Sequence, residues 1–132
     1  MAVLSVKNLK KNFGSTEVLK GVSFELEKGQ VLSVVGSSGG GKTTLANIVT
    51  RFSDPQKGRV LIGNTDIRDI PKETLMNQVS FVFQNSRLIK ASVLENVRMA
   101  RPGAAREEVV NALKAAQCMD IIEKFPDGVR TV

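Results

Sequence analysis

The chain has 132 residues, of which 42% are hydrophobic and 24% charged, a composition typical of one small globular domain. Its apolar runs are much shorter than the roughly 20 residues that span a bilayer, and it lacks a secretory pattern at its start, so we expect a cytoplasmic protein. The net charge of +6 comes from scattered Lys and Arg residues without interleaved aromatic residues, which argues against nucleic-acid binding. One cysteine, Cys118, excludes an internal disulfide framework, and its place in a helical pattern predicts a buried apolar role.

The first half of the chain shows strand and turn patterns around one helix. Alternating or continuous apolar residues predict strands at residues 3–9, 21–27, 30–36 and 58–67, with turns at 13–18, 27–29 and 54–58. The segment 30–36 is almost entirely apolar at its end, as a strand buried on both faces of a sheet would be. From Lys42 to about Arg51 apolar residues recur at helical spacing, so we expect a helix there.

The second half is mainly helical. Apolar spacing and helix-start signals predict helices at residues 71–78, 91–100 and 106–125, followed by a turn at 125–132. Residues 79–84 interrupt this pattern as a short, strongly apolar strand. Ser92 and Glu95 have the spacing of a capping box. In this motif the serine side chain accepts a hydrogen bond from the main-chain N–H of the glutamate, and the glutamate side chain accepts one from the main-chain N–H of the serine.

Between the strand expected at 30–36 and the helix that follows, Gly36, Gly41, Lys42 and Thr43 match the pattern G-x-x-x-x-G-K-[ST]. The glycines let main-chain N–H groups turn inward around phosphate oxygens, where a side chain would block the approach. The positive end of the helix points at the same anions, Lys42 adds a mobile charge, and the Thr43 hydroxyl can ligate Mg²⁺. The alternative is a flexible Gly/Ser loop with a solvated Lys42. We favour phosphate binding because a strand before the loop and a helix after it are the required setting.

These residues resemble the nucleotide-binding domain of an ABC transporter. The segment VGSSGGGKTTL is similar to that family's Walker A motif, although many members carry Ser-Gly-Ser-Gly where this chain has Ser-Gly-Gly-Gly at residues 38–41. The segment LKKNFG lies where the family places an aromatic residue that stacks on adenine, which implies that role for Phe13. The segment SFVFQNSRLIKASVLENV resembles the Q-loop region, which makes Gln84 the Q-loop glutamine.

The resemblance implies ATP and Mg²⁺ as ligands. It gives catalytic roles to Lys42 and Gln84, and it makes Thr43 and Gln84 metal ligands. The residues implied in nucleotide binding are Phe13, Gly36, Ser37, Ser38, Gly39, Gly40, Gly41, Lys42, Thr43 and Thr44. An apolar patch could also receive a transmembrane coupling helix, with plain core packing as the alternative; its members are Leu88, Ile89, Val93, Leu94 and Val97.

The implied fold is α/β and P-loop NTPase-like but truncated, with N-terminal antiparallel strands, part of the core sheet with the P-loop helix, and the start of a helical subdomain. We expect an ATP-binding core at residues 1–84 and an incomplete helical subdomain at 85–132. The family's signature, Walker B and switch-histidine segments do not occur in these 132 residues, which contain no histidine. We therefore expect the parent protein to hydrolyse MgATP for transport, and this chain alone to bind nucleotide weakly with negligible turnover.

The resemblance also implies partners and a location. We expect a transmembrane domain, a second nucleotide-binding domain, and a cytoplasmic position at the membrane surface. Apolar strand edges left unpaired predict that the isolated chain self-associates. One alternative is a small-molecule P-loop kinase, which the Q-loop resemblance disfavours. Another is a hydrolysis-incompetent half-domain, natural or engineered, that acts as a folding or interaction module. Residues up to about 45 resemble importer ATPases and those from about Ile48 resemble exporters, so the direction of transport stays open, as do substrate and preferred nucleotide.

Overall fold

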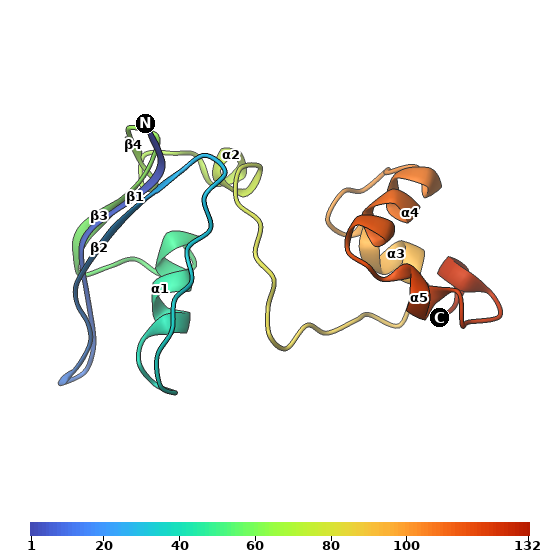
Figure 1. Cartoon of the computed structure of the whole chain (residues 1–132), viewed down its shortest axis with the longest axis horizontal. Helices are drawn as coiled ribbons and strands as arrows, with labels where there is room; N and C mark the ends of the chain where they lie inside the picture. The colour runs from blue at the N-terminus through green and yellow to red at the C-terminus, as the bar shows by residue number, and fades with distance from the viewer. The chain divides into compact units, whose positions relative to one another are not determined.

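The computed structural model describes all 132 residues, which divide into two compact units, residues 1–81 and 82–132. The first unit contains a four-stranded antiparallel sheet with the strand order β2-β1-β3-β4 (Figure 1). Its strands are β1 (Ala2–Phe13), β2 (Thr16–Glu27), β3 (Lys57–Ile62) and β4 (Thr65–Asp66). Two helices, α1 (Lys42–Val49) and α2 (Lys72–Met76), belong to the same unit. The strands expected near residues 3–9 and 21–27 and the helix from Lys42 are thus confirmed. The single strand expected over 58–67 is instead two antiparallel strands, β3 and β4, because the chain turns at Gly63 and Asn64.

The central strand β1 pairs with β2 on one side and β3 on the other. Its contact with β3 is unusually close at Gly58, where an added Cβ would lie 2.4 Å from the carbonyl oxygens of Lys7 and Asn8. Gly58 also has a φ of +89°, a conformation that side chains disfavour. The register between β1 and β3 shifts at the same place, between Lys7 and Lys10. A glycine is therefore required for β3 to reach β1 at this irregularity.

The core of the first unit lies between the sheet and the two helices. Leu45 and Ile48 are the buried residues of α1, as the helical spacing predicts, and Leu75 is the buried residue of α2. They form one cluster with Val6, Leu9, Leu19, Val60, Ile67 and Ile70. Complete burial of an aliphatic side chain contributes about 1.5–3 kcal/mol, so this cluster is the main source of stability that holds α1 against the strands.

The chain leaves α1 through Arg51, which clamps the next segments in place. Arg51 has a φ of +58°, and its guanidinium group donates from one nitrogen to the carbonyl oxygens of Ile67 and Ile70, both at 2.9 Å. Hydrogen bonds from a charged donor are stronger than those between neutral groups. The guanidinium therefore ties the end of α1 to the segment that leads from β4 into α2.

Two strands expected from the sequence do not form. Residues 30–36 and 79–83 form no strand pairing. Most of their apolar side chains are exposed, with Val31 at 93%, Val35 at 89% and Val82 at 92%, whereas Val79 packs against the core cluster. A strand exists through hydrogen bonds to a neighbouring strand, and no segment of this chain pairs with either. The apolar composition of the two segments predicts burial, but Val31, Val35 and Val82 are exposed in this chain.

The second unit consists of short helices: α3 (Val93–Arg98), α4 (Arg106–Ala115), α5 (Met119–Ile122) and the 3₁₀ turn η1 (Gly128–Arg130). Its buried cluster comprises Ala104, Val109, Leu113, Ile122 and Val129. No helix of the structure combines the length and the apolar character that crossing a bilayer requires.

The expected capping box is present at the start of α3. The Ser92 side chain accepts from the Glu95 N–H, and the Glu95 carboxylate accepts from the Ser92 N–H at 2.9 Å. These hydrogen bonds from Ser92, first from its main chain and then from its hydroxyl, lower the pKa of Glu95 below its usual value. The helix expected over 106–125 is instead divided, because Gln117 adopts a φ of +58°. Cys118 therefore lies at the break before α5 and is half-buried, which corrects the expectation of a buried helical cysteine.

Candidate nucleotide-binding site

The glycine-rich loop curls before it enters α1. The Gly40 N–H donates to the Ser37 carbonyl oxygen at 3.1 Å, and Gly39 and Gly41 have φ angles of +81° and +87°. Residues 36–40 are exposed, so this loop is open to a ligand. Successive main-chain N–H groups in such turns form a concave surface that suits an anion.

The N-terminus of α1 has no protein group that neutralises it. Gly41 is the N-cap and offers no side-chain hydrogen bond, and the first turn contains no acidic residue. The N–H groups of Lys42, Thr43 and Thr44 donate to no other group of the chain. Because the first N–H groups of a helix lack intrahelical partners and carry its positive dipole end, this terminus can receive an anion through three donors.

The Lys42 side chain folds back over the loop. Its ammonium group donates to the carbonyl oxygens of Gly36 at 2.6 Å and Ser37 at 2.7 Å. Two of its three protons are thus occupied, and the positive charge is held at the loop. A bound phosphate can accept the remaining proton or replace the two carbonyl oxygens as the acceptor.

Gly41 fits its position for two independent reasons. Its φ of +87° favours glycine, and an added Cβ would lie 2.9 Å from a Val18 methyl and 3.0 Å from a Leu19 methyl on β2. Leu19 is part of the buried cluster, so it cannot move aside freely. The start of α1 is therefore seated directly on β2, which sets where the glycine-rich loop lies in the first unit.

The other predicted site residues are placed as follows. Thr43 is exposed in the first turn of α1 and Thr44 is half-buried there. Phe13 ends β1 and is 57% exposed, and both the β1–β2 hairpin tip and the loop before α1 extend to the lower end of the first unit in Figure 1. Gln84 is exposed and belongs to the second unit. The structure thus brings Gly36–Thr44 together, and the joint action of these residues with Gln84 stays a prediction.

The geometry adds a residue that the sequence argument did not single out. The Lys11 ammonium lies 5.7 Å from the centre of the Phe13 ring. The signal was present in the sequence, because side chains two residues apart in a strand point to the same face. Lys11 and Phe13 meet this condition at the end of β1.

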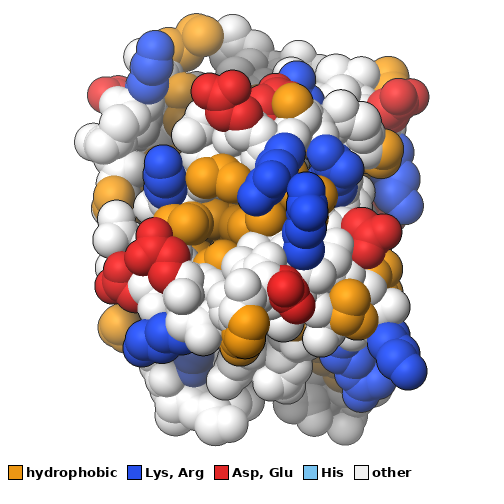
Figure 2. All heavy atoms as spheres, turned by 90° about the vertical axis from the view of Figure 1, so that its right-hand side faces the viewer, with side chains coloured by type: hydrophobic (Ala, Val, Ile, Leu, Met, Phe, Trp, Pro, Cys, Tyr) orange, Lys and Arg blue, Asp and Glu red, His pale blue; other side chains and the backbone are white.

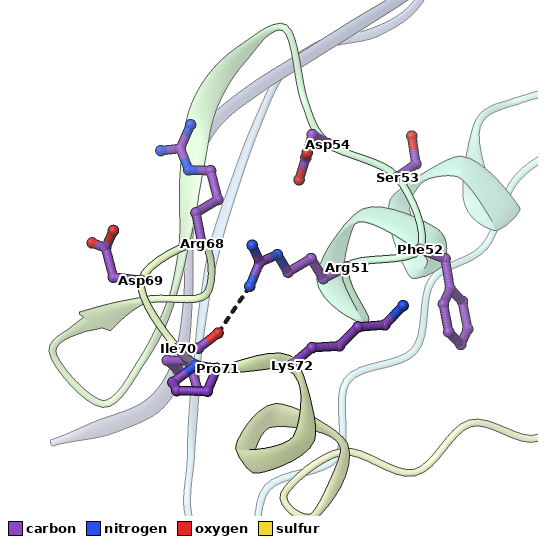
Figure 3. Close-up of a pocket in the computed structure, with 9 residues that line it drawn as sticks. All are labelled: Arg51, Phe52, Ser53, Asp54, Arg68, Asp69, Ile70, Pro71 and Lys72. Carbon is purple, nitrogen blue, oxygen red and sulfur yellow. Dashed lines mark hydrogen bonds between the residues drawn. The ribbon is translucent and has the colours of Figure 1, made fainter.

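The first unit contains a cavity with a volume of about 550 Å³, which lies beyond the C-terminal end of α1 (Figure 3). Its lining includes Arg51, Asp54, Arg68 and Lys72, and Figure 3 shows the Arg51 guanidinium turned to the Ile70 carbonyl. The Arg68 guanidinium makes a paired contact with Asp66, at 2.9 Å and 2.7 Å, and the hydrogen bond lowers the pKa of that carboxyl. These contacts hold the segment between β4 and α2 in place. The charged residues Arg51 and Arg68 that line the cavity therefore have structural roles.

An apolar cavity of about 630 Å³ lies within the second unit. Figure 2 shows one face of the molecule, on which hydrophobic side chains gather near the centre, with both basic and acidic side chains around them. Four of the five residues expected in a docking patch line the cavity: Leu88, Ile89, Val93 and Val97. Leu88 is 80% exposed, whereas Val93, Leu94 and Val97 pack against the buried cluster. The patch therefore has an exposed part and a core part, and its role in docking stays a prediction.

The antiparallel sheet, the glycine-rich loop and α1 define a P-loop NTPase-like α/β protein. Comparison with known families refines this class. The model of the family described as "ABC transporter" matches residues 19–130. The chain belongs to the ABC transporter family.

Individual relatives agree with this assignment. The chain is 42% identical over 114 residues to an ATP-dependent lipid A-core flippase of Chromobacterium violaceum, and 41% identical over 114 residues to the putative multidrug export ATP-binding/permease protein YgaD of Bacillus subtilis. Each alignment covers 86% of this chain and 20% of the relative. A bacterial Atm1-family ABC exporter solved with ATP bound matches 97% of this chain and 23% of its own, with a TM-score of 0.89 and 36% identity. The chain thus spans about a fifth of the length of these relatives.

Proposed function

We propose that this chain is the nucleotide-binding part of an ABC exporter that hydrolyses MgATP to power transport. Gly36–Thr44 hold the phosphates, Lys42 neutralises the outer ones, and Phe13 stacks on the adenine. The observation that carries this proposal is the N-terminus of α1, which has three main-chain donors without protein acceptors, no acidic residue in its first turn, and the Lys42 ammonium folded over the loop. This arrangement suits a polyphosphate better than any neutral ligand.

The chemistry of the donor set fits a magnesium-bound nucleotide. The Thr43 hydroxyl follows the lysine in the first turn of α1, and hydroxyl and amide oxygens are suitable ligands for Mg²⁺. We therefore assign Thr43 and Gln84 to the metal, which would neutralise charge on the transferred phosphoryl group. Phosphoryl transfer also needs a group that orients the attacking water. Because the family's signature, Walker B and switch-histidine segments do not occur in these 132 residues, we propose that this chain binds nucleotide but turns it over negligibly.

The assignment to export rests on the relatives. Both curated proteins above are named for a flippase or a multidrug export function, and the solved neighbour is an exporter. We propose that the whole protein pairs this part with a transmembrane domain and a second nucleotide-binding domain, at the cytoplasmic face of the membrane. The division into an ATP-binding core at 1–84 and a helical subdomain at 85–132 belongs to the same proposal.

Calorimetric titration tests the binding half of this proposal. We expect the affinity to fall in the order MgATP, MgADP, AMP, because each lost phosphate removes acceptors for the loop N–H groups and for Lys42. A phosphate-release assay on the same chain is expected to stay at background. Equal affinity for ATP and AMP would refute the phosphate site, and transporter-like phosphate release would refute the lack of turnover.

The exposed segment at 31–35 leads us to propose self-association of the isolated chain. Val31 and Val35 are almost fully exposed apolar residues in a segment with an unpaired main chain, and such a segment favours pairing with a strand of another copy. Light scattering at several concentrations should give dimers or larger species. Replacing both valines with Lys should lower the mean mass, whereas Val132→Lys, at another exposed valine, should leave it unchanged. A monomer at every concentration would contradict the proposal.

A further inference from the structure

The Lys11 side chain contacts both Phe13, the residue expected to stack on the nucleotide base, and the loop that follows α1. Its ammonium lies 5.7 Å from the Phe13 ring centre and also donates to the Asp54 carbonyl oxygen at 2.8 Å. A cation within about 6 Å of an aromatic ring centre is attracted to the ring. Asp54 follows shortly after α1, where Figure 3 labels it beside Ser53. One ammonium group thus contacts both the aromatic ring and the segment that ends the P-loop helix.

The main chain around Phe13 is held on both sides, which fixes the point from which the ring projects. Phe13 pairs with Thr16 across the β1–β2 hairpin. On the other side, Gln56 donates from its N–H to the Lys10 carbonyl at 3.0 Å, and its side-chain amide both donates to and accepts from the Asn12 main chain. With 57% of its surface exposed, Phe13 retains room for a ligand beside the ammonium.

We propose that Lys11 is a positioning residue for the nucleotide base, acting through Phe13. Anchored on the Asp54 carbonyl, the ammonium attracts one face of the ring, limits its rotation and draws electron density from it. Aromatic rings attract each other most when their charge distributions are complementary, so an electron-depleted ring is a better platform for an electron-rich purine. The base then stacks on the remaining exposed surface of Phe13. This inference rests on the proposed function, because it requires a nucleotide at the loop.

The test compares two ligands that share the phosphates and differ in the base. Calorimetric titration of the 132-residue chain with MgATP and with magnesium tripolyphosphate separates the base contribution from the phosphate contribution. We expect Lys11→Met to weaken ATP binding about two- to fivefold more than it weakens tripolyphosphate binding, which is the size of an exposed cation–π contact. Lys11→Arg keeps a cation above the ring and should retain ATP affinity.

Two further variants separate positioning from charge and fold. Lys10→Met removes the same charge from the neighbouring position of β1, so it should change both ligands equally. In a Phe13→Leu background, Lys11→Met should have no additional effect on ATP, because the ring through which Lys11 acts is gone. Circular dichroism should show the same sheet content in all variants.

An unchanged or tighter ATP affinity in Lys11→Met, or an equal loss for both ligands, would overturn the inference. If the wild-type chain binds tripolyphosphate as tightly as ATP, stacking of the base on Phe13 is refuted, whereas phosphate binding at the loop is supported. If it binds neither ligand, the proposed function fails and the inference with it.

Discussion

Replacing Lys42 with Ala is expected to lower the affinity for ATP at least about a hundredfold. The ammonium is the one charged group folded over the loop, where it now donates to the Gly36 and Ser37 carbonyl oxygens. In the complex it would donate to phosphate oxygens instead, and a hydrogen bond to a charged group contributes about 1.5–3 kcal/mol, so two of them account for this loss. Calorimetric titration with MgATP measures it.

Lys28→Ala is the matched control for charge. Lys28 lies in the turn after β2, is exposed and makes no hydrogen bond or ion pair with its side chain, so its loss should change ATP affinity only slightly. Thermal unfolding of Lys42→Ala should match the wild type, because its ammonium contacts only exposed loop carbonyls. Unchanged ATP affinity in Lys42→Ala would argue against the whole assignment of the phosphate site.

Replacing Gly58 with Ala is expected to reduce the free energy of unfolding by more than about 3 kcal/mol. The new Cβ would lie 2.4 Å from two main-chain oxygens of the central strand, those of Lys7 and Asn8, at a φ of +89°. Main-chain atoms cannot rotate away, so β3 must separate from β1 or both must distort, and strain of this kind is among the few causes of such large losses. Urea unfolding followed by circular dichroism measures the change.

Gly63→Ala provides a control that isolates the clash. Gly63 also has a positive φ, of +57°, but its added Cβ would meet nothing within 4 Å. Its substitution should therefore cause only the backbone strain of about 1–2 kcal/mol. Equal losses in the two variants would show that the close approach of β3 to β1 does not matter for stability.

Short-range patterns were sufficient to predict most elements of this chain. The alternation in β1, the helical spacing of Leu45 and Ile48 and the Ser92–Glu95 capping box each depend on residues close in sequence. The G-x-x-x-x-G-K-[ST] pattern likewise indicated a loop at the start of a helix, because the glycines and the helix N-terminus are consecutive. These features need no information on distant partners, and the structure contains each of them.

Features that depend on distant partners could not be predicted in this way. Whether residues 30–36 form a strand depends on a neighbour that no local pattern reveals, and in this chain they remain unpaired. The need for glycine at position 58 arises because β3 comes within contact distance of the Lys7 and Asn8 carbonyls. The contact of the Lys11 ammonium with both the Phe13 ring and the Asp54 carbonyl oxygen, 43 positions away, likewise depends on the tertiary structure.

The sequence by itself thus determined the kind of loop, the lysine it carries and the helix it precedes, because those are consecutive residues with strong local preferences. Only the tertiary structure decided that Lys42 folds over the loop, that Gly41 sits directly on β2 and that Arg51 closes the far end of α1. The physical reason is that hydrogen bonding and packing between remote segments are set by three-dimensional proximity, which sequence spacing does not encode.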